Sequence, residues 1–371
     1  MIAMEAATPF QIFTCINLLK KYQNREVDLF LYTYATNLNL IAEKLRKEKL
    51  FRKIYIIDSI PQKNRFSLIK YMLFSKKMLP KVKIEKYESL YISYSGIPNL
   101  LLYNLLRTKN KNINLYFYED GVTSYYKGIF EHSMNVRRLC YFLRKQIDSE
   151  KISKVLLYEP QLNSVQYKNN VILDKLTVTN SKININLIKN IFSISKNAET
   201  IIKEANILYF DHDFRKYITK DIFINFDQNI IVNNIANQLN QKIIVKVSPL
   251  SKNESSKYEG NLITVSNFDK APWEILIYDD KDIEKKCLIS ICSNAVITPK
   301  TVYGKEPYVL ILGKALFLSG CTNSTDVWTK EMEEFYNRIK GLYYDKTKFM
   351  IPETLDEALE MLRIILKRIK R

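Results

Sequence analysis

Residues 2–20 read IAMEAATPFQIFTCINLLK, and this stretch decides the fold class. Its first part, Ile2 to Ala6, is a short apolar run with the length of a buried strand, whereas Phe10 to Lys20 repeats apolar residues at helical spacing. Thr8-Pro9 between them favours a helix start, because proline lacks only an N–H that the first turn leaves unpaired anyway. A strand that leads directly into a helix predicts the beginning of a βαβ unit.

The same alternation of apolar runs and amphipathic stretches continues along the chain. In the first half we expect strands at 2–6, 27–32, 53–57, 90–94, 113–118 and 155–158, and a further helix at 38–49. The polar, asparagine-rich stretch 161–182 is typical of a connection. After it we expect strands at 207–210, 243–247, 261–265, 288–292 and 308–312. The sequence therefore predicts an α/β fold of two units.

We place the domain boundaries at 1–185 and 186–353, followed by a helix over 354–371. Thr354 and Glu357 stand in capping-box spacing and mark the start of this last helix. Its end is basic, and so is a second amphipathic stretch from Lys63 to Lys86. Basic amphipathic helices bind anionic membrane surfaces, although an ordinary helix with a core-facing stripe has the same pattern.

Composition excludes several classes of protein. The chain has 371 residues, a net charge of +18 and 47% hydrophobic residues, which excludes a disordered chain. The first residues lack the pattern of a signal peptide, and no apolar run has the length of a membrane span, so we expect a cytoplasmic protein, peripheral at most to the inner membrane face. The basic residues are spread and not gathered beside stacking aromatics, so nucleic acid is not the expected partner.

Small residue counts exclude several kinds of site. His132 and His212 are the only histidines, and the five cysteines form no Cys-x-x-Cys pair, so a zinc site of the usual spacing is excluded. With eight glycines there is neither a Gly-x-Gly-x-x-Gly motif nor a Walker loop. We predict no metal, and any nucleotide must be held without a glycine-rich loop.

Ligands of open α/β sheets bind beyond the carboxyl ends of the strands, so the residues after each strand are the candidates. In the first unit these are Thr8-Pro9-Phe10-Gln11 and Glu119-Asp120-Gly121. Adjacent carboxylates repel one another, which raises the pKa of one of them and suits it to take a proton from a hydroxyl. An Asp-Gly turn with solvated acids is the plainer alternative.

Three segments of the second unit meet the same criterion. Lys246-Val247-Ser248-Pro249 combines a lysine and a hydroxyl beside a proline, a pattern that suits a phosphate. In Ser290-Ile291-Cys292-Ser293-Asn294-Ala295 an apolar strand gives way to a helix, so hydroxyl and N–H groups can hold an anion there, although Ser293 can also be a plain helix cap. Pro272-Trp273-Glu274 completes the set.

Together these five segments, in this order and approximate spacing, resemble bacterial sialyltransferases of glycosyltransferase family 52, the lipooligosaccharide and capsule sialyltransferases. The resemblance covers about residues 8 to 313. It implies a GT-B fold, in which two Rossmann-like domains face across a cleft, the first holding the acceptor and the second the nucleotide. It also implies inverting, metal-independent transfer of sialic acid from CMP-sialic acid to a galactose-terminated surface glycan, with no cofactor.

The resemblance assigns a role to each segment. Asp120 is the expected base that takes the proton of the acceptor hydroxyl, with Asp211 and Asp213 as substitutes. The residues expected around the acceptor are Thr8, Pro9, Gln11, Glu119 and Gly121; those expected around the nucleotide are Lys246, Pro249, Glu274, Ser290, Ser293 and Asn294, with Glu274 accepting from the ribose.

One position departs from the family. Ser248 stands where the family has a histidine that acts on the departing phosphate, and serine is no acid near neutral pH. We expect Lys246 and Ser293 to compensate by charge and hydrogen bonding, with His212 as an alternative acid. Three further possibilities stay open: another nucleotide-sugar donor on the same fold, a basic nucleic-acid-binding protein, and assembly into a homodimer.

Overall fold

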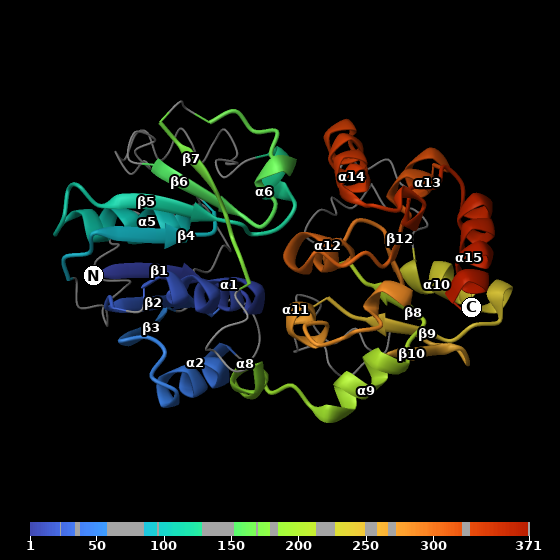
Figure 1. Cartoon of the computed structure of the whole chain (residues 1–371), viewed down its shortest axis with the longest axis horizontal. Helices are drawn as coiled ribbons and strands as arrows, with labels where there is room; N and C mark the ends of the chain where they lie inside the picture. The colour runs from blue at the N-terminus through green and yellow to red at the C-terminus, as the bar shows by residue number, and fades with distance from the viewer. Residues whose placement is uncertain are drawn as a thin grey trace. The chain divides into compact units, whose positions relative to one another are not determined.

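The structure is a computed structural model, which describes residues 1–22, 24–33, 38–57, 85–94, 96–127, 152–167, 170–178, 185–212, 227–248, 258–265, 272–320 and 327–369. The chain divides into two compact units, Met1–Asn184 and Ile185–Arg371. Each unit is built around one parallel sheet with helices packed beside it (Figure 1).

The first sheet has seven strands in the order β3-β2-β1-β4-β5-β6-β7. Their bounds are β1 Ile2–Ala6, β2 Val27–Tyr32, β3 Lys53–Ile57, β4 Ser89–Ile92, β5 Asn114–Tyr118, β6 Ile152–Leu157 and β7 Ile172–Lys175. The chain first moves outward from β1 and then returns to place β4 on the other side of β1. The direction of winding therefore reverses between β1 and β4, and this is where doubly wound sheets bind ligands.

Helices α1 (Pro9–Leu19), α2 (Leu38–Lys47), α5 (Ile97–Arg107) and α6 (Thr123–Tyr126) connect these strands, together with the short turns η1 (Lys20–Tyr22) and η3 (Pro160–Leu162). The start of α1 confirms the prediction made from Thr8-Pro9. Thr8 accepts from the Gln11 N–H at 3.3 Å, and the Gln11 side chain accepts from the Thr8 N–H at 3.1 Å. This reciprocal capping box fixes where the chain turns from strand to helix.

The second sheet has six strands in the order β10-β9-β8-β11-β12-β13. Their bounds are β8 Ile207–Phe210, β9 Ile243–Lys246, β10 Ile263–Val265, β11 Cys287–Ser290, β12 Tyr308–Ile311 and β13 Phe349–Met350. Counted from β8, this is the 3-2-1-4-5-6 order of a Rossmann sheet, with its reversal between β8 and β11.

Around this sheet lie helices α8 (Ile185–Ile191), α9 (Lys196–Glu204), α10 (Gln228–Leu239), α11 (Trp273–Leu276), α12 (Thr298–Tyr303), α13 (Gly313–Leu318), α14 (Lys330–Leu342) and α15 (Leu355–Ile369), and turns η6 (Ile283–Lys285), η7 (Asn294–Val296) and η8 (Lys346–Lys348). The predicted two-unit α/β fold is thus confirmed, with strand ends that differ from the prediction by up to three residues.

Two strands escaped prediction. β7 lies inside the stretch 161–182, which we expected to be only a connection, and most of its residues are exposed. It is an edge strand held to β6 by backbone pairing and by the ion pair of Lys154 with Asp174 at 3.2 Å, so it needs no apolar side chains on a buried face. β13 has only two residues and pairs with β12.

The apolar face of α15 belongs to the core of its own unit. The helix starts after Thr354, whose hydroxyl accepts from the Glu357 N–H at 3.1 Å, so the predicted helix start is confirmed. Leu362 and Ile365 are buried, and the helix packs against α10. The apolar stripe is therefore not available to a membrane. Of the basic stretch 63–86, only residues 85 and 86 fall within the described part of the chain.

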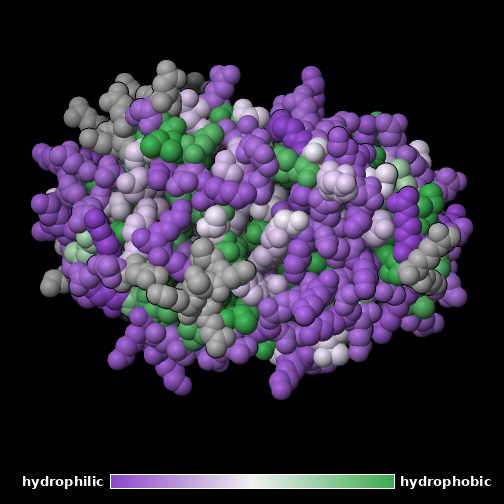
Figure 2. All heavy atoms as spheres, viewed as in Figure 1, coloured by the Kyte–Doolittle hydropathy of each residue, from purple (hydrophilic) through white to green (hydrophobic). Residues whose placement is uncertain are grey.

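Hydrophilic residues cover most of the face of the molecule seen in Figure 2. In the ranges given above, we find no helix with both the length and the apolar character needed to cross a membrane.

Candidate functional site

Three carboxyl groups lie where β1 and β5 end in the first unit. Glu5 is the fourth residue of β1, and Glu119-Asp120 follows β5 directly. Only β4 separates these two strands in the sheet. The three acidic residues therefore flank the point where the winding of the sheet reverses, which is the expected place for a ligand.

Gln11 joins two of the predicted segments. Its Oε1 accepts from the N–H groups of Ala7, at 2.5 Å, and Thr8, at 3.1 Å, so the side-chain NH2 group must point the other way. There Nε2 donates a hydrogen bond to Asp120 Oδ1, across 109 residues of sequence. The beginning of α1 thus holds the carboxylate that follows β5.

Asp120 has the properties of a base that works near neutral pH. Its side chain is half-buried, and burial raises its pKa to about 6, while the hydrogen bond from Gln11 acts in the opposite direction. Its backbone N–H donates to Ser124 Oγ at 3.0 Å, and Gly121 continues the chain at φ 121°, a value that favours glycine. The group is ionised at neutral pH and clearly more basic than an ordinary aspartate.

Glu119 is turned toward the interior of the domain. Its side chain accepts from the Tyr125 hydroxyl and, at 2.8 Å, from the Tyr158 N–H. It is 4% exposed, and burial raises its pKa to about 7. These contacts tie α6 to the end of β6, so Glu119 supports the position of Asp120. A direct contact with the acceptor stays a prediction.

Glu5 is the residue that our sequence analysis missed. Its side chain is fully buried, and Oε2 accepts from the N–H of Ser93 at 3.1 Å and from its hydroxyl at 3.2 Å. Burial, together with the charge of Asp120, raises the pKa of Glu5 to about 8. The signal was present in the sequence, because an acidic residue inside an apolar strand is unusual and ionisable groups with perturbed pKa values gather at functional sites.

In the second unit, Asp211 and Ser248 meet at the ends of β8 and β9. The Asp211 carboxylate accepts from the Tyr258 hydroxyl at 2.6 Å and from the Ser248 N–H at 3.4 Å. Asp211 is buried and has these two interior partners, whereas Asp120 remains half-buried. This difference favours Asp120 over Asp211 as the base. Asp213 and Pro249 lie outside the described residues.

Lys246 and Glu274 come together from two of the predicted segments. Lys246 ends β9 and is 5% exposed, and Glu274 lies in α11. Burial raises the pKa of Glu274, and the nearby charge of Lys246 acts against that rise. Trp273 anchors α11, because its ring packs against Phe210 at 4.7 Å between ring centres. A cation and a carboxylate thus lie near each other at the carboxyl ends of the central strands.

The serine segment after β11 is a compact turn. Ser290 Oγ donates to the Phe210 carbonyl at 3.0 Å and accepts from the Ser293 N–H at 2.9 Å, and the residue has no exposed surface. Ser293 caps η7 by accepting from the Ala295 N–H at 3.4 Å, and Asn294 is exposed. Ser290 therefore ties β8, β11 and the turn together. Contacts of Ser293 and Asn294 with a nucleotide stay predictions.

His212 is half-buried just beyond β8. Its backbone N–H donates to Gln228 Oε1 at 3.3 Å, and its carbonyl accepts from Gln228 Nε2 at 2.9 Å. The start of α10 thus fixes its backbone. Over the ranges that the structure describes, no group of three or more His, Cys, Asp or Glu side chains is arranged to hold a metal ion, and metal independence stays a prediction.

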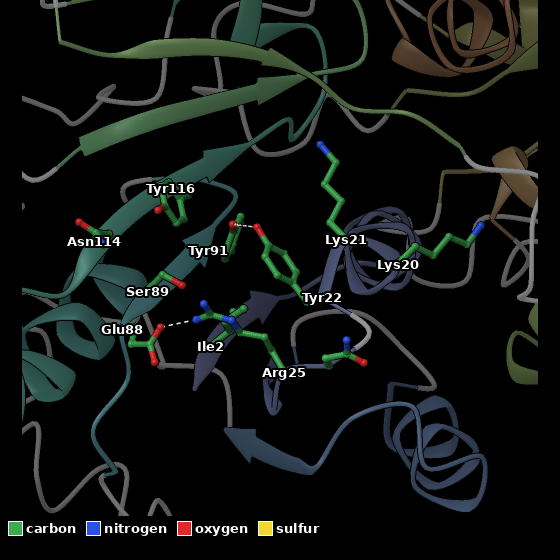
Figure 3. A pocket seen from close by; sticks show the side chains of 11 residues that line it. Ile2, Lys20, Lys21, Tyr22, Arg25, Glu88, Ser89, Tyr91, Asn114 and Tyr116 are labelled. Carbon is green, nitrogen blue, oxygen red and sulfur yellow. Dashed lines mark hydrogen bonds and ion pairs between the residues drawn. The ribbon is translucent and has the colours of Figure 1, made fainter.

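A hollow of about 780 Å³ lies at the opposite, amino-terminal end of the first sheet (Figure 3). Ile2, Ser89 and Asn114, which begin β1, β4 and β5, line part of it. Two of its charged groups, Arg25 and Glu88, pair with each other. None of the predicted site residues lines this hollow, so we place the candidate site at the carboxyl ends of the strands.

Comparison with known proteins bears on the fold. No protein-family model matches the chain, and no curated protein matches its sequence. Among solved structures, an α/β-galactoside α-2,3-sialyltransferase from the luminous marine bacterium Photobacterium phosphoreum superposes with a TM-score of 0.53 at 11% identity, over 96% of this chain and 98% of that one.

Two further structures are similar at lower scores. The calicheamicin glycosyltransferase CalG4 has a TM-score of 0.46 at 7% identity, over 100% of this chain and 99% of that one. A UDP-N-acetylglucosamine 2-epimerase has a TM-score of 0.48 at 10% identity, over 100% and 96%. At such low identity a likeness shows the fold alone. With its two Rossmann-like sheets, this chain has a fold of the GT-B type.

Proposed function

We propose that this protein is an inverting glycosyltransferase that moves sialic acid from CMP-sialic acid to a galactose-terminated glycan of the bacterial surface, lipooligosaccharide or capsule, without a metal or cofactor. The observation that carries the proposal is the hydrogen bond from Gln11 to Asp120. It joins the two segments of the first unit that resemble the family, and it leaves a carboxylate of raised pKa at the edge of the sheet where ligands bind.

In this proposal Asp120 takes the proton from the acceptor hydroxyl while the oxygen attacks the anomeric carbon of the sialyl group. A general base must be ionised before the reaction and must become a good proton acceptor during it, and a pKa of about 6 satisfies both needs at neutral pH. Gln11 orients the carboxylate and keeps it ionised, because a hydrogen bond to the charged form stabilises that form.

The second unit would hold the nucleotide. Lys246 supplies positive charge, and Ser248 and Ser293 supply hydrogen-bond donors, for the phosphate that carries the developing charge. Glu274 would accept from the ribose hydroxyls. Support for this part is the proximity of Glu274 to Lys246 and the position of both at the carboxyl ends of the strands. The leaving phosphate would thus be stabilised by charge and hydrogen bonds and would need no protonation.

One feature favours a second candidate, transfer from another nucleotide sugar on the same fold. Ser248 occupies the place of a family histidine, and it lies beside Asp211 with its N–H bonded to that carboxylate. A donor whose leaving group is assisted differently would suit this arrangement. Contact with an anionic membrane and assembly into a homodimer are further proposals, the former limited to the basic face of α15.

The test compares donors directly. Purified protein is incubated with a lactose-terminated acceptor and, in separate reactions, with CMP-sialic acid or with a panel of UDP-sugars. Mass spectrometry then identifies the product by its mass. We expect sialyl transfer, undiminished by EDTA. Transfer from a UDP-sugar alone would establish the second candidate, and activity lost to EDTA and restored by magnesium or manganese would contradict metal independence.

A further inference from the structure

We propose that Glu5 is a neutral carboxylic acid, with its proton on Oε1 and donated to the Asn99 side chain, and that it is a positioning residue that leaves Asp120 as the ionised member of the pair. Its effect on catalysis rests on the proposed function. Its protonation does not, because that follows from hydrogen bonding inside the first unit.

The hydrogen bonds of Glu5 are incomplete as long as the group is ionised. Oε2 accepts two bonds from Ser93, but Oε1 is buried and has no partner. An ionised carboxylate can only accept hydrogen bonds, so it has no donor for a neighbouring acceptor. A buried oxygen without a hydrogen-bond partner destabilises the folded state.

Asn99 carries a second buried oxygen that has no hydrogen-bond partner. This residue of α5 is fully buried, and its side-chain Nδ2 donates to the Tyr94 carbonyl at 3.0 Å. Its Oδ1 has no partner, and the side chain lies within interaction range of the Glu5 carboxyl. One proton on Glu5 Oε1 supplies a donor for Asn99 Oδ1, and both unsatisfied oxygens are then explained together.

The titratable groups around Glu5 also favour its neutral form. It faces the Tyr118 hydroxyl of β5, Asp120 just beyond β5, and the Cys15 thiol of α1. Ser93, which follows β4, and Asn99 of α5 are uncharged; their hydrogen bonding to an ionised Glu5 would lower its pKa, but burial has the larger effect. Burial raises the pKa of both Tyr118 and Cys15, so these two are neutral as well. Asp120 then carries the negative charge of this group. Two carboxyl groups so close to each other in a buried place do not both ionise readily.

The charge of Glu5 should affect catalysis, because the proposed sugar donor is itself anionic. With Glu5 protonated, Asp120 is the ionised member of the pair and can accept a proton. When Glu5 loses its proton in mildly alkaline solution, a second negative charge appears in a buried place, and binding of a sugar donor with its own carboxylate and phosphate becomes weaker. We therefore expect activity to fall at alkaline pH as Glu5 ionises.

Protonation is tested without any substrate. An infrared difference spectrum at neutral pH between the wild-type protein and Glu5→Gln should contain a carboxylic-acid carbonyl band in the wild type that shifts in D2O. The band should titrate away with a midpoint near the pKa of about 8 given above. Glu26→Gln, an exposed glutamate before β2, is the matched control and should leave the band in place. Carboxylate bands alone at neutral pH would overturn the proposal.

A second measurement keeps the test decisive if Glu5→Gln does not fold. In wild-type protein with 13C-labelled glutamate carboxyls, one buried signal should titrate in the mildly alkaline range. In Ser93→Ala that midpoint should rise, because the variant loses a hydroxyl that stabilises the charged form. A glutamate spectrum without an alkaline titration would contradict a neutral Glu5.

The pH–rate profile then tests the role. Wild-type kcat/KM should fall at alkaline pH, and Glu5→Gln, which is permanently neutral and can still donate to Asn99, should retain its rate there. An unchanged alkaline fall in Glu5→Gln would refute the role of Glu5 while leaving its protonation intact. If no sialyl transfer occurs at all, the proposed function fails, and the infrared result still decides the state of Glu5.

Discussion

Gln11 Nε2 donates a hydrogen bond to Asp120 Oδ1, so one side chain both closes the capping box of α1 and holds the carboxylate that follows β5. The amide can do so because its oxygen is occupied by the N–H groups of Ala7 and Thr8. The position of the proposed base therefore depends on how the first helix begins. We therefore expect different effects from replacing Asp120 and from replacing Gln11.

Replacing the base should abolish most of the turnover. Asp120→Asn keeps the shape of the side chain and can still accept from Gln11, but it cannot take a proton. We expect kcat for sialyl transfer to fall by at least about a hundredfold, with CMP affinity nearly unchanged, because a positioned base acts mainly in the transition state. Steady-state kinetics and calorimetry measure the two quantities. Near-normal turnover would remove Asp120 from the mechanism.

Replacing Gln11 should move the acidic side of the pH–rate profile. The Gln11 hydrogen bond stabilises ionised Asp120, so in Gln11→Leu the pKa of Asp120 should rise above its value of about 6, and activity should be lost at a higher pH than in the wild type.

Thr8→Ala is the matched control for Gln11→Leu, because it removes the other half of the capping box. Both variants should lose about 0.5–2 kcal/mol of stability, since both weaken the start of the helix. Only Gln11→Leu should shift the pH profile. Equal shifts in the two variants would show that helix stability, and not the hydrogen bond, controls the base.

Stability should depend on pH through Glu5. Its pKa is raised from 4.5 to about 8, so the folded protein keeps a proton that the unfolded chain releases. The stabilisation from this group is complete below about pH 4.5 and is lost as the pH rises toward 8. Within that window the slope is about 1.4 kcal/mol per pH unit for one extra bound proton. Urea unfolding at a series of pH values should give a shallower slope for Glu5→Gln than for the wild type or Glu26→Gln. Parallel curves for all three proteins would contradict the raised pKa.

Glu274 should contribute to nucleotide affinity. Glu274→Gln removes the charge that would accept from the ribose hydroxyls, and we expect CMP binding to weaken by about 1–3 kcal/mol, the cost of an unpaired buried polar group. Asp282→Asn, at an exposed position nearby in the sequence, is the control and should bind CMP like the wild type. Isothermal calorimetry distinguishes the two. Unchanged affinity in Glu274→Gln would place the ribose elsewhere.

Ser248 offers a test of how the leaving phosphate is stabilised. If charge and hydrogen bonds have replaced a proton donor, Ser248→His should raise kcat on CMP-sialic acid by up to about 10²–10⁴-fold, the range of general acid catalysis. His212→Ala should leave the wild-type rate nearly unchanged. A protein that folds and binds CMP, gains nothing from the histidine and is inactivated by His212→Ala would instead assign the acid to His212.

The sequence alone determined the architecture of this protein and the segments that form its candidate site. The central strands are mostly apolar, because a parallel sheet buries both of its faces, and such runs stand out from the amphipathic helices between them. The helix starts at Thr8-Pro9 and Thr354 were equally visible, since capping is a local interaction between residues a few positions apart. β7 was not visible, because an exposed edge strand is held by its neighbour's backbone and leaves no apolar pattern.

Only the tertiary structure decided which of these residues act together. Gln11 meets Asp120 across 109 residues because the sheet places β1 and β5 on either side of β4. The same packing buries Glu5 without enough donors, and it uses the apolar face of α15 for the core of its own unit. Burial, pKa and hydrogen-bond partners depend on neighbours that are distant in the chain, so a local pattern can name a carboxylate but cannot determine its charge.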